Sequence, residues 1–173
     1  MNTDLLTLME TRRSVRSFKP DMIPSDVIDQ IIKAGTYAAT GMNRQSPIII
    51  AVTNKEMRDR LSRMNAKIMG SDKDPFYGAP VVLIVLAKKE APTHVYDGSL
   101  VMGNLMLAAA SLGLGSCWIN RAKEEFESEE GKALLKKWGI EGEWIGVGHC
   151  ILGYPAGDPQ PAAPRKSDYI LKV

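Results

Sequence analysis

The sequence predicts one domain, residues 1–173, of mixed helices and strands in the α+β or α/β class. Three observations support this prediction. Segments with apolar residues at helical spacing alternate along the chain with short β-branched runs, which are typical of buried strands. No internal repeat or domain linker interrupts them, and a chain of 173 residues can bury about two thirds of its surface in one domain. A long apolar helix pattern also runs directly into a strand pattern.

Three helices and two strands are predicted in the first half of the chain. Thr3, Ser25 and Asn54 can each cap a helix, because their side-chain oxygens accept backbone N–H groups. The strands are the apolar, β-branched runs Ile48–Val52 and Val81–Leu86. A basic stretch, a polar loop and a turn-rich connection separate these elements, at residues 12–18, 40–47 and 70–80.

The second half of the chain predicts one long apolar helix, one acidic helix and two strands. The helix pattern that begins at Asp97 is apolar on nearly every face, so the helix is buried in the domain centre or in a dimer interface. It ends at a pair of glycines, and the strand Ser116–Ile119 follows. The acidic helix spans Lys123–Trp138, and the last strand spans Trp144–Leu152. A proline-rich arm follows, which cannot form a helix or an inner strand.

Composition argues against several classes of protein. Basic and acidic residues nearly balance, with a net charge of +2, so we expect no nucleic-acid partner. No apolar run reaches the length of a membrane span and no signal-like segment is visible, so we expect a cytoplasmic protein without membrane contact. Cys117 and Cys150 lie in apolar, strand-like runs and fit buried reduced thiols better than a disulfide.

Residue spacings typical of catalytic and metal sites are mostly absent. The sequence contains no P-loop, no complete dinucleotide fingerprint, no nucleophile elbow and no C-x-x-C motif. The two histidines are His94 and His149, and His149 on an alternating strand fits a core histidine better than a ligand. A zinc site built from these histidines and the two cysteines lacks paired ligand spacing, so we expect no metal.

The most informative polar segment is the basic stretch RRSVRSF at residues 12–18. Its three arginines and the serine between them offer forked donors and a hydroxyl suited to a phosphate group. A solvated basic turn explains the same residues equally well. Arg165 and Lys166, at the end of the proline-rich arm, would add to a phosphate site if the arm folds back to the same place.

The loop Thr40–Gln45 is a second polar segment of interest. Its side chains can donate and accept hydrogen bonds, and loops on a rigid scaffold frequently bind ligands. On local grounds alone, an ordinary polar turn explains this loop better.

In combination these stretches resemble the FMN-dependent nitroreductase family, in the form of its short bacterial and archaeal members. The similar stretches, in the order of the family, are RRSVRSF, ATGMNRQSP, DPFYGAPVVLIV, LAAASLGLGSCWI and GHCILGYPAGDPQPAAPRK. They span nearly the whole chain, and each is loose singly but specific jointly. The resemblance implies an α+β sandwich with a central mixed sheet flanked by helices. It also implies a homodimer whose C-terminal arms are exchanged.

The resemblance further implies that two FMN molecules lie in the dimer interface. The contacts implied on the FMN phosphate come from both basic ends of the chain: Arg12, Ser14 and Arg16, their neighbour Arg13, and Arg165 and Lys166 of the arm. The contacts implied on the flavin ring are Thr40, Gly41 and Asn43 from the other subunit, Asn65 at the pyrimidine end, and Trp118, Ile119 and Asn120 under the reacting edge.

The activity implied by the resemblance is that of an NAD(P)H-dependent FMN oxidoreductase in which the flavin carries the redox chemistry. A hydride would pass from NADH or NADPH to flavin N5 and then to a flat, electron-poor acceptor such as a nitroaromatic or a quinone. We expect no catalytic side chain. Two alternatives are a flavin-dependent oxidase or dehydrogenase of a specific metabolite, and a flavin-binding protein without turnover. The chain departs from the family pattern in two places: Ile48 replaces an aromatic residue, and Asn120 replaces an acidic one.

Overall fold

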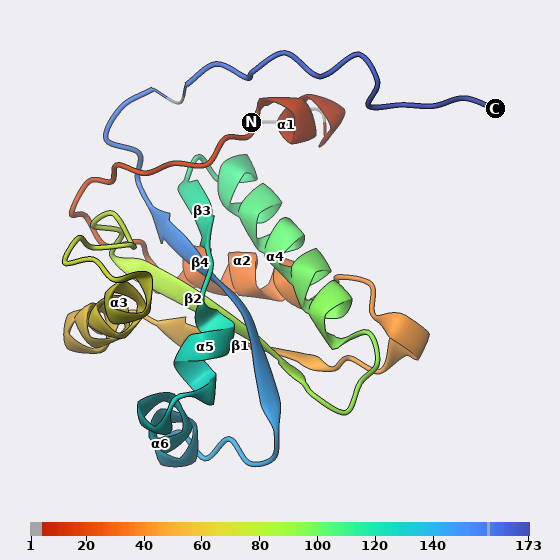
Figure 1. Ribbon diagram of the computed structural model, residues 1–173. Coiled ribbons are helices and arrows are strands. Elements are labelled where there is room, and N and C mark those ends of the chain that lie inside the picture. Colours follow the sequence, from red (N-terminus) through yellow and green to blue (C-terminus); the bar gives the residue numbers. More distant parts are fainter. Residues whose placement is uncertain (1–4, 159) are drawn as a thin grey trace.

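The computed structural model describes residues 5–158 and 160–173 and is built around one four-stranded sheet (Figure 1). The strand order in the sheet is β1-β2-β4-β3. In chain order the strands are β1 (Pro47–Val52), β2 (Val81–Lys88), β3 (Gly115–Ile119) and β4 (Trp144–Gly153). The four strands predicted from the sequence are therefore present, and the α+β class is confirmed.

The four strands pair antiparallel throughout, so the expectation of a mixed sheet is corrected. For the first pair, the reason lies in the connection between β1 and β2. Helix α3 (Lys55–Met69) carries the chain away from the end of β1, and residues 70–80 bring it back. Val52 consequently pairs with Val82 at the same end of the sheet. Parallel pairing within the described residues is limited to an isolated bridge between Ser14 and Ser116.

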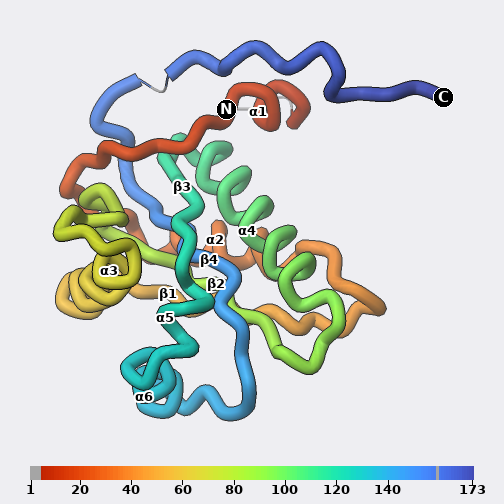
Figure 2. The backbone as a smooth tube through the Cα atoms, in the orientation of Figure 1, coloured from red at the N-terminus to blue at the C-terminus, as the bar shows by residue number. Residues whose placement is uncertain are grey.

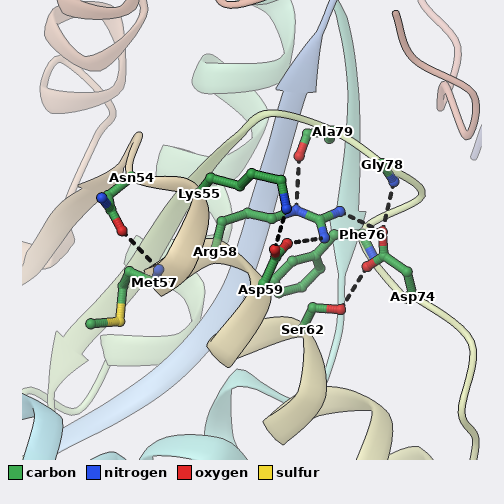
Figure 3. A network of polar contacts seen from close by, with 10 residues as sticks. All are labelled: Asn54, Lys55, Met57, Arg58, Asp59, Ser62, Asp74, Phe76, Gly78 and Ala79. Atoms are coloured by element: carbon green, nitrogen blue, oxygen red, sulfur yellow. Dashed lines mark hydrogen bonds and ion pairs between the residues drawn. The ribbon is translucent and has the colours of Figure 1, made fainter. Parts of the chain in front are cut away.

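The connection at residues 70–80 is fixed to α3 by a buried arginine (Figure 3). Arg58 donates from Nε to the carbonyl of Ala79 at 3.0 Å and from Nη2 to the carboxylate of Asp74. Asp74 also accepts from the Ser62 hydroxyl at 2.6 Å and from two backbone N–H groups of the connection. Because these charges are paired within the chain, the cluster stabilises the turn-rich connection that the sequence predicts.

Helices cover both faces of the sheet and close two apolar cores (Figure 1). One face carries α2 (Ser25–Thr36) and α4 (His94–Ser111), packed on β-strand residues such as Leu83 and Leu152. The other face carries α3, α5 (Ala122–Glu127) and α6 (Glu129–Lys137), packed on residues such as Ile84 and Ile151. Helix α1 (Leu5–Thr11) lies against α4, and the short 3-10 helix Gly41–Asn43 precedes β1.

Helix boundaries differ from the sequence prediction in two places. The acidic segment forms two helices, because the Ser128 hydroxyl accepts the N–H of Gly131 at 3.0 Å and begins α6 as a new helix. Ser25 is the first residue of α2 and makes no cap, whereas Asn54 caps α3 through the N–H of Met57 as predicted. Thr3, the predicted cap of the first helix, lies outside the described residues.

Helix α4 is buried on one side and exposed on the other. Val101, Met102 and Leu105 face the core. Tyr96 and Leu100 are 73% and 52% exposed. Packing within one chain therefore buries only one side of this apolar helix, and apolar side chains of the other side lie on the surface.

Strand β4 departs from strict alternation at Val147. Val85 of β2 pairs with Gly148 and Leu86 pairs with Gly146, so Val147 is an extra residue in β4. The two glycines on either side leave room for neighbouring elements, because a Cβ on Gly146 would lie 2.1 Å from the Ala122 carbonyl oxygen at the start of α5. The shift explains why the predicted alternation along this strand fails at its middle.

The proline-rich arm begins beside the basic stretch and then leaves the domain. Ala156 donates its N–H to the Ser17 carbonyl at 3.0 Å, and Lys19 donates to the Tyr154 carbonyl at 2.9 Å. From residue 160 to the end, every residue is exposed, including Leu171 at 86%. Figure 2 shows this part as an extended tube separate from the sheet. The prediction that the arm forms neither a helix nor an inner strand is confirmed.

Both cysteines are free and buried, as the sequence predicts. They lie in adjacent antiparallel strands, with Cys117 in one apolar core and Cys150 in the other. Burial raises the pKa of the Cys150 thiol to about 12. Within residues 5–158 and 160–173, no helix has the length and hydrophobicity needed to cross a membrane.

Candidate functional site

The basic stretch lies along the edge strand of the sheet. Ser14 forms the parallel bridge to Ser116, and Val15 donates its N–H to the Ser116 carbonyl at 3.0 Å. A Cβ on Gly115 would lie 2.9 Å from the Val15 side chain, so the glycine after α4 allows this close approach. The sequence predicts the basic stretch but not its position beside β3.

The basic stretch and β3 carry buried polar atoms that have no hydrogen-bond partner among the described residues. Arg12 Nη1, Ser116 Oγ and Trp118 Nε1 are buried, and none of them has a hydrogen-bond partner among the described residues. A buried donor left unpaired costs about 1–3 kcal/mol, and more when it is charged. These atoms therefore fit a site completed by a bound anion and a polar ring system.

The other polar residues of the basic stretch differ in how free their side chains are to bind a ligand. Arg13 turns back and donates from Nη1 to the carbonyls of Glu10 and Arg12, which lie at and just after the end of α1. Ser14 and Arg16 are exposed. Arg12, Ser14 and Arg16 are thus open to a ligand, whereas Arg13 is partly engaged by the backbone.

The loop before β1 is held by a carboxylate that the sequence does not single out as functional. Asp97 of α4 is 2% exposed and accepts the Gly41 N–H at 2.9 Å. It also accepts the hydroxyls of Ser46 and Thr93, each at 3.0 Å. Burial raises the pKa of Asp97, but these three hydrogen bonds outweigh burial and hold the pKa below its usual value of 3.8.

The same loop carries a strained backbone and an exposed tip. Met42, Asn43 and Gln45 have φ values of +54°, +53° and +49°, in the left-handed region that L-residues seldom adopt. Thr40 Oγ1 accepts the N–H of Gln45 at 3.1 Å and stabilises the turn. Met42 is 85% exposed. Strained residues on a rigidly held, protruding loop are typical of a ligand-contacting segment.

The end of β3 is fixed by Asn65 of α3. Trp118 is half-buried, Ile119 is buried, and the following Asn120 is exposed. Asn65 is fully buried and donates from Nδ2 to the Asn120 carbonyl at 2.9 Å. The structure therefore brings Asn65 to the predicted flavin strand, but with its side chain inside the protein.

The remaining candidates lie apart from this strand within one chain. The loop at residues 40–46 is bonded to α4 near the first residue of the helix, whereas the basic stretch lies just beyond the last residue of the helix. The two ends of α4 are about 25 Å apart. Arg165 donates to the Ala163 carbonyl, and Lys166 lies 3.8 Å from Asp168. No hydrogen bond or ion pair among the described residues joins Arg165 or Lys166 to Arg12.

The fold and the site define a class of protein: an α+β domain with an anion-suited basic stretch and unpaired polar groups along the edge of its central sheet. Comparison with known proteins identifies the family. The model of the nitroreductase family matches residues 9–75 and 68–154. The chain therefore belongs to the nitroreductase family.

Individual relatives agree with this membership over nearly the whole chain. A nitroreductase with bound FMN from Bacteroides fragilis is 29% identical, with a TM-score of 0.90 over 99% of this chain and 100% of that one. A nitroreductase with bound FMN from Desulfitobacterium hafniense is 25% identical, with a TM-score of 0.87 over 100% of both chains. A protein of Archaeoglobus fulgidus named "Putative NADH dehydrogenase/NAD(P)H nitroreductase" is 31% identical over 88% of this chain and 86% of its own.

Proposed function

We propose that the protein is an NAD(P)H-dependent FMN oxidoreductase that acts on a flat, electron-poor acceptor. The observation that carries the proposal is the buried, unpaired Arg12 Nη1 of the basic stretch, together with the unpaired Ser116 Oγ and Trp118 Nε1 of the adjoining strand β3. FMN supplies both a phosphate dianion and a polar ring, so the residues present fit the cofactor. The FMN-bound relatives and the names of the NAD(P)H-dependent relatives support the same cofactor and reductant.

The residues that would hold FMN divide between its two ends. Arg12, Ser14 and Arg16 would bind the phosphate through charge-assisted hydrogen bonds, with Arg13 as a neighbour. Trp118, Ile119 and Asn120 would lie under the ring. Arg165 and Lys166, on an arm that begins beside Ser17, would add further positive charge at the phosphate.

When bound, FMN supplies the hydride chemistry between NAD(P)H and the acceptor. The residues of the chain then have three tasks, which are to anchor the phosphate, to present the backbone N–H groups near Asn120 to the ring, and to exclude water from the buried side of the site. No side chain is needed as a catalytic acid.

A homodimer is part of the proposal. The loop at residues 40–46 and the basic stretch lie near opposite ends of α4, so Thr40, Gly41 and Asn43 would reach the flavin of the partner subunit rather than their own. The exposed apolar side of α4 and the exposed arm residues Tyr169–Leu171 supply a surface for such a contact. Obligate dimers of this kind commonly have no stable monomer.

An anaerobic reduction experiment tests the proposed activity. The FMN-loaded protein is mixed with NADH or NADPH, the loss of the yellow flavin absorbance is followed, and a panel of nitroaromatics and quinones is then added. Rapid bleaching followed by recovery with an acceptor supports the oxidoreductase. Tight FMN binding without bleaching would instead indicate a flavin-binding protein without turnover.

A further inference from the structure

The amide of Asn65 uses every strong hydrogen-bonding group it has inside the protein. Its Nδ2 donates to the Asn120 carbonyl at 2.9 Å and to Glu125 Oε2 at 3.1 Å, and its Oδ1 accepts from Arg121 Nε at 2.9 Å. The orientation of the amide is fixed by these partners, because the reverse orientation would place an acceptor against two acceptors. Asn65 therefore has no N–H group left to donate to a cofactor.

A buried glutamate side chain holds Asn65 in this orientation. Glu125 of α5 is 0% exposed, and its Oε2 lies 3.2 Å from His149 Nε2 of β4, which is equally buried. Phe76 and Phe126 surround the His149 ring, with centroids 5.3 and 6.3 Å away. The histidine that the sequence assigns to the core is thus in the core, next to a carboxylate that bonds Asn65.

Two of the three partners of Asn65, Asn120 and Arg121, belong to one turn. Asn120 is the first residue after β3, and Arg121, the N-cap residue just before α5, has a φ of +76°, in the left-handed region. Such a conformation costs a non-glycine residue about 1–3 kcal/mol and persists only where surrounding contacts enforce it. The amide of Asn65 bonds both residues of the turn, one through its carbonyl and one through its side chain.

We infer that Asn65, clamped by the buried Glu125–His149 pair, is a positioning residue that fixes the Asn120–Arg121 turn and acts on the flavin only through that turn. The inference rests on the proposed function for the location of the flavin and deepens it. It replaces a direct contact of Asn65 with the pyrimidine end of FMN. The backbone of the exposed residue Asn120 is then the group that meets the ring, and Asn65 sets its geometry from inside the protein.

Hydrogen–deuterium exchange on the apoprotein tests the tether without any cofactor. In Asn65→Ala the amides of residues 119–122 are expected to exchange about tenfold faster or more, because one hydrogen bond of about 1.5 kcal/mol corresponds to that factor. Glu125→Gln retains an oxygen that can accept from Asn65 Nδ2, so its exchange is expected to stay near wild type, while Glu125→Ala loses this acceptor and follows Asn65→Ala. Glu124→Gln, the exposed neighbour on α5, is the matched control.

The loaded protein provides a second readout. Since the phosphate contacts remain, Asn65→Ala is expected to bind FMN within about threefold of wild type but to lose about tenfold or more in kcat, and to shift the flavin midpoint potential. A weakening of FMN binding by tenfold or more together with wild-type exchange at residues 119–122 would overturn the inference and indicate a direct contact. If Asn65→Ala does not fold, Arg121→Ala decides, because alanine has no side-chain donor for Asn65 Oδ1. Wild-type exchange at residues 119–122 in that variant would also overturn the inference. A wild-type protein that fails to bind FMN would refute the proposed function, whereas the exchange experiment on the apoprotein would still test the tether.

Discussion

Asp97 on α4 and Gly41 in the loop before β1 are joined by a hydrogen bond of 2.9 Å, although 56 positions separate them in the chain. A Cβ on Gly41 would lie 2.4 Å from Thr93 Oγ1, a second group that bonds the same carboxylate. The glycine and the aspartate therefore depend on each other: the missing side chain lets the loop approach α4, and the carboxylate holds it there.

Asp97→Ala is expected to lower the free energy of unfolding by about 3 kcal/mol, because it leaves a backbone N–H and two hydroxyls without their acceptor. Urea denaturation followed by circular dichroism measures the change. Ser99→Ala, on the same helix, removes only a bond to the Val95 carbonyl and should change stability by less than about 0.5 kcal/mol. Equal stability of the two variants would show that the Asp97 cluster does not stabilise the loop.

Asp74 predicts a loss of stability in acid. Burial raises its pKa, but hydrogen bonds from Arg58, Ser62 and two backbone N–H groups outweigh burial and hold the pKa below 3.8. The folded state thus binds this proton more weakly than the unfolded chain, so the stabilisation is complete above about pH 4 and is lost as the pH falls through the lower folded-state pKa.

Urea unfolding between pH 7 and pH 2 measures the contribution of Asp74. Asp74→Asn is expected to be less stable than wild type at pH 7 and to show a flatter decline below pH 4. Asp72→Asn, an exposed neighbour in the same connection, should reproduce the wild-type curve. A wild-type decline of the same steepness in Asp74→Asn would assign the acid effect to other carboxylates.

Arg12→Ala is expected to weaken FMN binding by about tenfold or more and riboflavin binding much less, because one charge-assisted contact to the phosphate contributes about 1.5–3 kcal/mol. Fluorescence-quench titration with both flavins gives the two affinities. Arg63→Ala, an exposed arginine on α3, serves as the control for a general loss of positive charge. The phosphate assignment is wrong if FMN and riboflavin lose affinity to the same extent.

Arg165→Ala tests the arm in the same assay. We expect a similar loss of FMN affinity and only partial recovery in Arg165→Lys, since a point charge cannot reproduce the guanidinium fork. Lys172→Ala, further along the exposed arm, should bind FMN as wild type does. An Arg165→Ala protein with unaltered FMN affinity and an unaltered far-UV spectrum would separate the arm from the site.

Gly146→Ala should destabilise the fold by about 2 kcal/mol or more, because the new methyl group would meet the Ala122 backbone oxygen and push α5 away from β4. Gly157→Ala is the matched control, as a Cβ there meets no atom within 4 Å. Thermal unfolding monitored by circular dichroism compares the two. Similar melting temperatures would show that α5 can move without loss.

The elements of the fold were readable from the sequence because local patterns determine them. The β-branched run around Ile84 and the cap at Asn54 depend on neighbours only a few positions away, and both are observed as predicted. Local patterns predicted two details wrongly. The Ser128 hydroxyl begins a new helix and so divides the predicted acidic helix in two, and the extra residue Val147 interrupts the predicted alternation of β4.

The sequence by itself determined the class of fold, the free buried cysteines and the membership of the chain in a family whose stretches it carries in order. Only the tertiary structure decided that the strands run antiparallel, that Asp97 holds the loop at Gly41, and that Asn65 faces Asn120 and Glu125 rather than an open site. The physical reason is that these contacts join residues more than 25 positions apart. Nothing in the local sequence of an asparagine on a helix reveals which distant groups will use its amide.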